Sequence, residues 1–256
     1  MFNLRNIEDS GVFLKKSIYL ACRDELSWSI SEDAKSLHSF CSNLSIPVNK
    51  TALFSPFIHF ICWYQVNFRR YRWIKGRRKI IATASSEVAV ENPQFQSMQS
   101  FVSLWIAPNK KQYNFFNKMG AKVAYQPFYV NENIFYPMQK TREELCQDLK
   151  IDHTLFKGKH LIGSFQRDSQ GENLMEPKPQ KDPQLFLDLI KNLSIDRDKI
   201  MVILAGPRRH YLLKKMQQEN IPYFYYGEEP KGLEDDVHIN NQNLETMSLL
   251  YNLLDA

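Results

Sequence analysis

Two cations flank a polar loop in the second half of the chain. Arg167 follows the apolar run HLIGSF (160–165), and Lys181 precedes a helix expected to open at Asp182 and Pro183. Arginine and lysine supply the donors and positive charge that a diphosphate needs, and a helix N-terminus adds free N–H groups. The two cations therefore predict an anion site, with a solvated basic loop as the alternative.

A second loop, AGPRRHY (205–211), follows the apolar run KIMVILAG (199–206). Gly206 lets the backbone turn closely past a ligand, and Pro207 starts a helix at a fixed φ. A plain strand-to-helix turn explains the same residues. The chain has no G-x-G-x-x-G and no P-loop motif, which excludes fingerprint-type dehydrogenases and P-loop kinases.

A basic patch lies at 68–79, FRRYRWIKGRRK, in a chain of net charge +5. Cations interleaved with aromatic residues after an apolar stretch are typical of an anchor on anionic lipid. A solvated loop and a site for a phosphorylated acceptor are the alternatives, and nucleic acid is disfavoured because residues 151–256 are acidic overall. The patch residues are Arg69, Arg70, Arg72, Trp73, Lys75, Arg77 and Arg78.

Other site chemistry has little support in the sequence. The six histidines are not at metal-ligand spacing and the four cysteines form no C-x-x-C pair, so we predict no metal, no cofactor and a reducing, cytosolic compartment. An acidic cluster near the C-terminus is predicted to be a solvated loop. Its members are Glu228, Glu229, Glu234, Asp235 and Asp236.

The elements that must position these residues alternate regularly from His160 onward. Strands are predicted at 160–165, 199–206 and 221–227, each followed by an amphipathic helix, which indicates a parallel sheet covered by helices on both faces. In the first half we expect strands at 17–24, 79–85 and 121–130 and a helix over 30–44. The apolar stretch 52–68 is expected to be buried or interfacial, since it is too short and too polar to span a membrane.

The polar, proline-containing connector NENIFYPMQK (131–140) separates these two parts. Thr141 with Glu144 has capping-box spacing and predicts the next helix start. We therefore predict two α/β domains, residues 1–139 and 140–256. The second has about three parallel strands, which is few for such a domain, and it is expected to be incomplete.

An ordered set of segments resembles the retaining, two-Rossmann-domain (GT-B) glycosyltransferases of the large "group 1" family. In the second half these are GSFQRD, PKPQKDPQLFLDLI, VILAGPRRHYLLKKM, IPYFYYG and LETMSLLYNLLDA. In the first half, LWIAPNKKQYNFFNKMGAKVAYQPFYVNENIFYP is similar to the end of that family's N-terminal domain. The resemblance implies transfer of a sugar from a nucleotide-sugar donor, with retention, to a glycan or lipid-linked acceptor in polysaccharide biosynthesis.

The resemblance also implies roles for individual residues. It places Arg167 and Lys181 on the donor diphosphate, with Gly163 and Ser164 near the phosphates. The loops that contain Gly206 and Pro207, and Gly227, would surround the nucleotide and base. The acceptor would lie on the N-terminal domain, with peripheral contact between the basic patch and the inner face of the plasma membrane.

Two departures from the family qualify this resemblance. Where relatives carry a histidine-glycine pair, this chain has Thr83, Ala84 and Ser85, so His59 or Glu87 is the candidate near the reacting centre. The E-G-G-P-type stretch that holds the donor sugar does not follow the last helix, and we expect a truncated chain with little turnover of its own. The alternative is a non-catalytic nucleotide- or phospholipid-binding α/β protein derived from such an enzyme.

Overall fold

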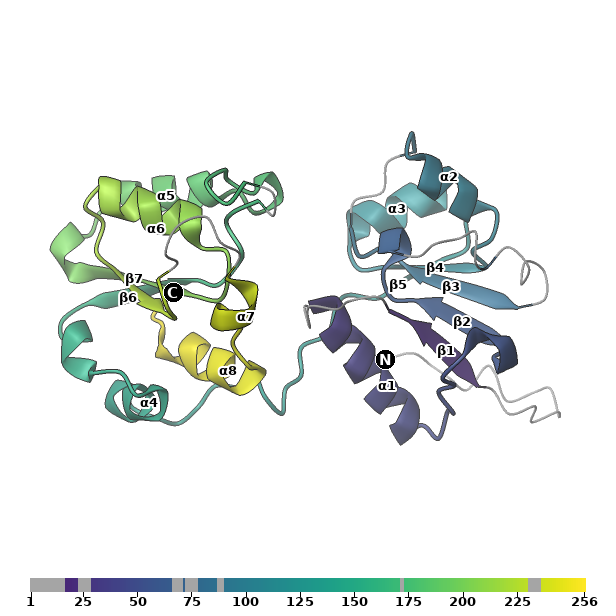
Figure 1. The fold of residues 1–256 in the computed structure, drawn as a ribbon, viewed down its shortest axis with the longest axis horizontal. Helices are drawn as coiled ribbons and strands as arrows, with labels where there is room; N and C mark the ends of the chain where they lie inside the picture. The colour runs from purple at the N-terminus through teal and green to yellow at the C-terminus, as the bar shows by residue number, and fades with distance from the viewer. Residues whose placement is uncertain are drawn as a thin grey trace. The chain divides into compact units, whose positions relative to one another are not determined.

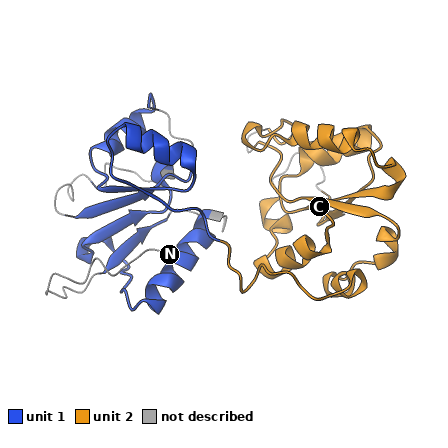
Figure 2. Ribbon diagram, turned by 180° about the vertical axis from the view of Figure 1, so that it is seen from behind, with its two compact units in different colours: residues 1–129 blue, residues 130–256 orange. Residues whose placement is uncertain are grey.

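The computed structural model describes residues 17–22, 29–65, 71, 78–86, 90–170, 173–229 and 236–256. The chain divides into two compact units, residues 1–129 and 130–256 (Figure 2). Each unit contains one parallel sheet with its own core. The predicted α/β class with two Rossmann-like parallel sheets is confirmed.

The described part of the first unit contains a five-stranded parallel sheet in the order β1-β2-β3-β4-β5. Its helix α1 lies on one face of the sheet, and α2 and α3 lie on the other (Figure 1). The strands are β1 (Ile18–Ala21), β2 (Phe57–Phe60), β3 (Lys79–Thr83), β4 (Leu104–Ala107) and β5 (Val123–Tyr125). The helices are α1 (Ser29–Asn43), α2 (Pro93–Gln99) and α3 (Lys110–Lys118), with short 3-10 turns at Ala52–Phe54 and Trp63–Gln65.

The second strand of this sheet lies inside the apolar segment 52–68. Ile58 and Phe60 are fully buried in the core of the unit, and the alternate residue His59 points to the other face. His59 pairs in register with Ile81 of β3. The expectation that this segment is buried is confirmed at Ile58 and Phe60, and residues 57–60 form a strand of the sheet.

The second unit has a three-stranded parallel sheet in the order β6-β7-β8. Alternate residues of β7 enter two different cores, because helices cover both faces of the sheet. The strands are β6 (His160–Ser164), β7 (Ile200–Ala205) and β8 (Tyr223–Tyr226). The helices are α4 (Arg142–Leu149), α5 (Pro183–Asn192), α6 (His210–Gln218), α7 (Val237–Asn240) and α8 (Leu244–Leu253), with 3-10 turns at His153–Phe156, Pro179–Lys181 and Arg197–Lys199.

The connector belongs to the second unit. The Ser248 hydroxyl donates to the Ile134 carbonyl (2.5 Å), and the Asn252 side chain donates to Tyr136 O (3.1 Å) and accepts from Met138 N (2.8 Å). These bonds hold the connector against α8. The chain therefore divides after Tyr129 rather than after the predicted Gln139.

Helix ends follow the local signals. Thr141 and Glu144 form the predicted capping box at α4. Gly120, at φ 69°, follows the last turn of α3. Within the described part of the chain, no helix has the length and apolar character needed to cross a bilayer.

Candidate functional site

A hollow of about 200 Å³ lies at the carboxyl end of β6, the edge at which open parallel sheets bind ligands. All four residues predicted to hold a diphosphate line it. The lining consists of Gly163, Ser164, Phe165, Gln166, Arg167, Asp168, Lys181, Pro183, Phe186, Leu212 and Tyr251. We call it the anion hollow.

Positive charge gathers at this hollow. Burial, followed by the nearby charges of Arg167, Lys181 and Arg208, lowers the pKa of Lys178. A lysine pKa falls beside other cations because each opposes its protonation. Arg167 and Lys181 line the hollow itself, and positive charge there favours a bound anion.

Two backbone residues beside the cluster adopt the left-handed conformation. Asp182 has φ 41° and Arg208 has φ 58°, both unusual for residues with a side chain. Such residues concentrate at ligand sites, where the surrounding structure holds a costly conformation in place. Asp182 also caps α5 by accepting from Leu185 N (3.2 Å), so the N-terminus of this helix already carries a carboxylate. The cations, rather than the helix terminus invoked from sequence, must supply the attraction for an anion.

A buried guanidinium lies behind the hollow. Arg209 is fully buried, and its Nη2 donates to Ser164 Oγ (3.1 Å). Its Nη1 is 3.6 Å from Asp168 Oδ2. Arg209 Nε and Nη1 and Asp168 Oδ2 have no hydrogen-bond partner among the described residues.

Asp168 links the loop after β6 to the start of α6. Its Oδ1 accepts from Tyr211 N (3.2 Å) and from Ser169 Oγ (2.8 Å). Burial raises the pKa of Asp168 to about 6, against the opposing effect of Arg209 and these hydrogen bonds. The carboxylate is thus ionised at neutral pH and offsets the charge of the buried Arg209.

Gly163 and Ser164 both line the anion hollow, and Gly163 also has packing around it that favours a glycine. Gly163 N donates to Ala256 O (2.9 Å), and a Cβ at position 163 would overlap the Leu254 side chain. Glycine leaves room there for the Leu254 side chain, since the segment after α8 lies alongside β6 and is hydrogen-bonded to it.

The residues predicted to surround the nucleotide lie outside the anion hollow. Gly206 has φ 84° and its carbonyl accepts from Tyr225 Oη (2.9 Å). Pro207 does not start the helix as expected, since α6 begins at His210. Gly227 lies under the side chain of Asn240, whose Oδ1 would be 2.6 Å from a Cβ at that position.

Of the two candidates near the reacting centre, one is described. His59 Nε2 is 2.8 Å from Thr83 Oγ1, and burial lowers the pKa of His59 to about 4, so the imidazole is neutral at pH 7. His59 thus contacts Thr83, one of the three residues that stand where relatives carry the histidine-glycine pair. Glu87 lies outside the described residues.

Most of the basic patch also lies outside the described residues, namely Arg69, Arg70, Arg72, Trp73, Lys75 and Arg77. Arg78 is described, and its Nη2 donates to Leu53 O (3.0 Å), so its side chain is held against the 3-10 turn before β2.

The acidic cluster is only partly described, with Glu234 and Asp235 outside the described ranges. Asp236 is buried rather than solvated. Its carboxylate accepts from Arg208 N (2.8 Å) and from Asn240 Nδ2 (2.8 Å), so it supports the loop beside the anion hollow. Among the described side chains, no three histidine, cysteine, aspartate or glutamate residues come together as a metal site would require.

Sequence reasoning missed Arg209 and Asp168 as parts of this site. The pair Arg208 and Arg209 offered a signal, because two arginines follow the glycine turn after a buried strand. The sequence does not indicate which of them points inward.

No protein-family model and no curated protein matches the sequence. Solved structures resemble the fold. HepE of Anabaena, solved with UDP, has a TM-score of 0.53 at 13% identity, over 82% of this chain and 69% of that one. A glycosyltransferase of Rickettsia africae has a TM-score of 0.46 at 13% identity, over 92% of this chain and 56% of that one.

The N-terminal domain of the Candida albicans trehalose-6-phosphate phosphatase has a TM-score of 0.43 at 13% identity, over 87% of this chain and 53% of that one. This chain thus spans little more than half the length of the last two structures. At 13% identity the likeness to HepE establishes the fold alone, and the two weaker likenesses carry no argument.

Proposed function

We propose that the anion hollow binds the diphosphate of a nucleotide-sugar donor, and that the chain is a glycosyltransferase or part of one. The observation that carries this proposal is that Arg167 and Lys181 line a hollow at the carboxyl end of a parallel strand, together with Gly163 and Ser164. The ordered segments shared with group 1 glycosyltransferases and the UDP in the HepE structure support the choice of a nucleotide.

In this proposal the cations act on the leaving group. Transfer of the sugar leaves negative charge on the departing nucleoside diphosphate, and fixed cations in a partly dry site stabilise that charge. Arg167 binds phosphate oxygens through paired N–H groups, and Lys181 adds a mobile point charge. The Ser164 hydroxyl, which accepts from Arg209, donates its own proton to a phosphate oxygen.

The finer parts of the proposal rest on the resemblance. They are retention at the anomeric carbon, a glycan or lipid-linked acceptor on the first unit, and a basic patch that contacts anionic lipid. In the proposed transfer Arg167 and Lys181 take the place of a divalent ion on the diphosphate, so no metal is invoked.

The proposal is tested by calorimetric titration of UDP into the 256-residue chain. Arg167→Ala and Lys181→Ala should each weaken binding about tenfold or more, because each removes a charge-assisted hydrogen bond. Lys214→Ala, on the exposed face of α6, is the matched control and should bind like the wild type. Unchanged affinity in both pocket variants, or an equal loss in the control, would refute the site.

A further inference from the structure

Two adjacent apolar residues are exposed just before the second strand of the first unit. Leu53 and Phe54 lie on the 3-10 turn Ala52–Phe54, and their side chains are 51% and 73% exposed. No residue of this turn is buried. One exposed apolar side chain is ordinary on a protein surface, but two in a row gain free energy if an apolar phase covers them.

The turn lies at the amino end of the first sheet. Phe57, the first residue of β2, pairs in register with Ile18 and Lys79, the first residues of β1 and β3. Open parallel sheets bind their ligands at the opposite, carboxyl end. The turn is therefore not part of the edge at which a substrate of this unit would bind.

Cations lie beside the turn. Arg78 Nη2 donates to the Leu53 carbonyl (3.0 Å), which holds a guanidinium against it. Lys79 is exposed, and its backbone N donates to Pro56 O (2.9 Å), two residues after the turn. Lys50, also exposed, comes two residues before the turn. The apolar pair is thus flanked by positive charge on both sides along the chain.

The sequence around the turn has no acidic residue to balance these cations. Residues 34–86 contain nine lysines and arginines, seven of them in 68–79, and neither aspartate nor glutamate. Positive charge attracts a surface of anionic lipid, and exposed apolar side chains add to that attraction by entering the boundary between headgroups and acyl chains. A nucleic acid would use the charge and could stack on an aromatic ring, but it offers nothing to the aliphatic Leu53.

We propose that the turn Ala52–Phe54 docks on an anionic phospholipid bilayer, with the side chains of Leu53 and Phe54 inserted at the headgroup boundary. Arg78, Lys79 and Lys50 contact the headgroups. This inference deepens the lipid contact of the proposed function, because it names the side chains that enter the bilayer. It does not depend on the anion hollow, which lies in the other unit.

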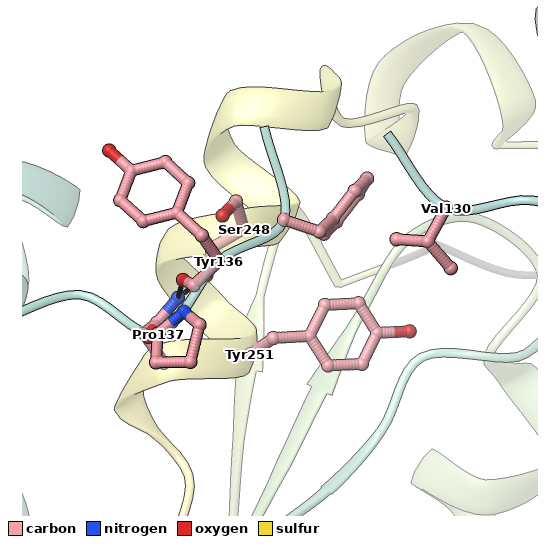
Figure 3. Close-up of a pocket in the computed structure, with 7 residues that line it drawn as sticks. Val130, Tyr136, Pro137, Ser248 and Tyr251 are labelled. Carbon is pink, nitrogen blue, oxygen red and sulfur yellow. Dashed lines mark hydrogen bonds between the residues drawn. The ribbon is translucent and has the colours of Figure 1, made fainter. Parts of the chain in front are cut away.

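The second unit offers a matched control surface. A hollow of about 520 Å³ lies between the connector and α8, and Figure 3 shows Val130 and Tyr136 among the residues that line it. Their side chains are 65% and 50% exposed, much like those of Leu53 and Phe54. None of the seven described residues that line this hollow is charged. Replacing Val130 and Tyr136 therefore removes similar exposed apolar surface from a place without flanking cations.

The test is sedimentation of the full chain with vesicles of phosphatidylcholine and phosphatidylglycerol, and with vesicles of phosphatidylcholine alone. The wild type should bind the anionic vesicles far more tightly, and about 1 M NaCl should release it because salt screens the attraction. Leu53→Ser with Phe54→Ser should weaken binding to anionic vesicles about tenfold, since less apolar surface enters the bilayer. Val130→Ser with Tyr136→Ser should bind like the wild type.

Phe54→Trp is the conservative variant. Tryptophan is favoured at membrane interfaces, so this variant should bind anionic vesicles at least as tightly as the wild type. A loss as large as that of the Leu53 and Phe54 serine pair would show that substitutions act through the fold of the turn, and would overturn the inference.

Two further outcomes would overturn the inference. The first is wild-type vesicle binding by the Leu53 and Phe54 serine pair, as expected if the cations serve a nucleic acid. The second is an equal loss in the Val130 and Tyr136 pair. Vesicle binding and UDP binding are separate readouts, so a wild type that binds anionic vesicles but not UDP would refute the nucleotide site alone.

Discussion

Arg209 does not line the anion hollow, but it hydrogen-bonds to Ser164, which does. Its guanidinium donates to Ser164 Oγ, so the Ser164 hydroxyl must direct its own proton to another acceptor. Its charge is offset by Asp168 at 3.6 Å. Arg209 is therefore a positioning residue, and its effects on folding and on binding can be separated by mutation.

Arg209→Met should lower the unfolding free energy of the second unit by about 3–5 kcal/mol, because Asp168 is left as an uncompensated buried charge. Asp168→Asn added to Arg209→Met should recover part of that loss, since Asn keeps an acceptor for Tyr211 N without the charge. Urea unfolding followed by circular dichroism measures both variants. A double variant no more stable than Arg209→Met would show that the two residues are not coupled.

His59 makes the stability of the first unit depend on pH. Its pKa is about 4 in the fold against 6.5 in a free chain, so the folded state binds fewer protons between these values. The unfolding free energy should therefore fall as the pH drops from about 6.5 to 4, by about 3 kcal/mol in total. His59→Gln keeps a partner for Thr83 and lacks this titration.

The measurement is the difference in unfolding free energy between wild type and His59→Gln, from pH 7 to 4. Asp33, in the same unit, has its pKa raised to about 6 by burial and by Glu32, which gives the opposite slope. Asp33 is present in both proteins, so the difference isolates His59. A difference that does not change with pH would contradict the account.

At the scale of elements, α7 contacts the residues that directly follow β8, Gly227 and Glu228. The Asn240 side chain accepts from Glu228 N (2.8 Å) and donates to Glu228 O (2.9 Å), directly over Gly227. The close approach of the Asn240 side chain gives a packing reason for glycine at position 227.

Gly227→Ala should cost about 1–3 kcal/mol of stability in the second unit, since the new methyl group forces Asn240 away. The folded protein should still bind UDP with wild-type affinity, because Gly227 does not line the anion hollow. Denaturant unfolding and calorimetry together check this. Weaker UDP binding with unchanged stability would mean that Gly227 contacts the nucleotide.

Elements with strong local signals could be predicted from the sequence. α4 follows from the Thr141 and Glu144 capping box, and β7 from an unbroken apolar run buried on both faces. β2 could not be assigned, because Pro56 and His59 interrupt an apolar stretch that also fits an interfacial segment. Only pairing with β1 and β3 defines it as a strand.

The residues of the candidate site that lie next to a predicted strand end or helix start could be predicted from the sequence. Arg167 and Lys181 lie next to a strand end and a helix start, and the parallel topology brings them to one hollow. The buried pair of Arg209 and Asp168 was not predictable, since loop conformation decides which arginine turns inward. The contribution of Tyr251 comes from α8, which reaches the hollow only through tertiary packing.

For the whole molecule, the two units differ in the spectroscopic signals that report their unfolding. All four tryptophans lie within residues 1–129, and residues 130–256 contain none. Tryptophan fluorescence thus follows the first unit alone, while far-ultraviolet circular dichroism follows both. The proposed ligand site lies entirely in the second unit.

UDP at 100 times its dissociation constant should stabilise the second unit by about 2.7 kcal/mol and raise its melting temperature by several degrees. The tryptophan transition should not move, because all residues that line the anion hollow belong to the second unit. Thermal unfolding followed by both signals checks this. A fluorescence transition that shifts with UDP while the second unit stays unchanged would place the ligand in the first unit.

The most direct test of the central claim is a crystal structure of the chain with UDP. The account predicts phosphate oxygens within hydrogen-bond distance of Arg167 and Lys181, in the hollow at the end of β6. Phosphates bound elsewhere, beyond hydrogen-bond distance of both side chains, would contradict it.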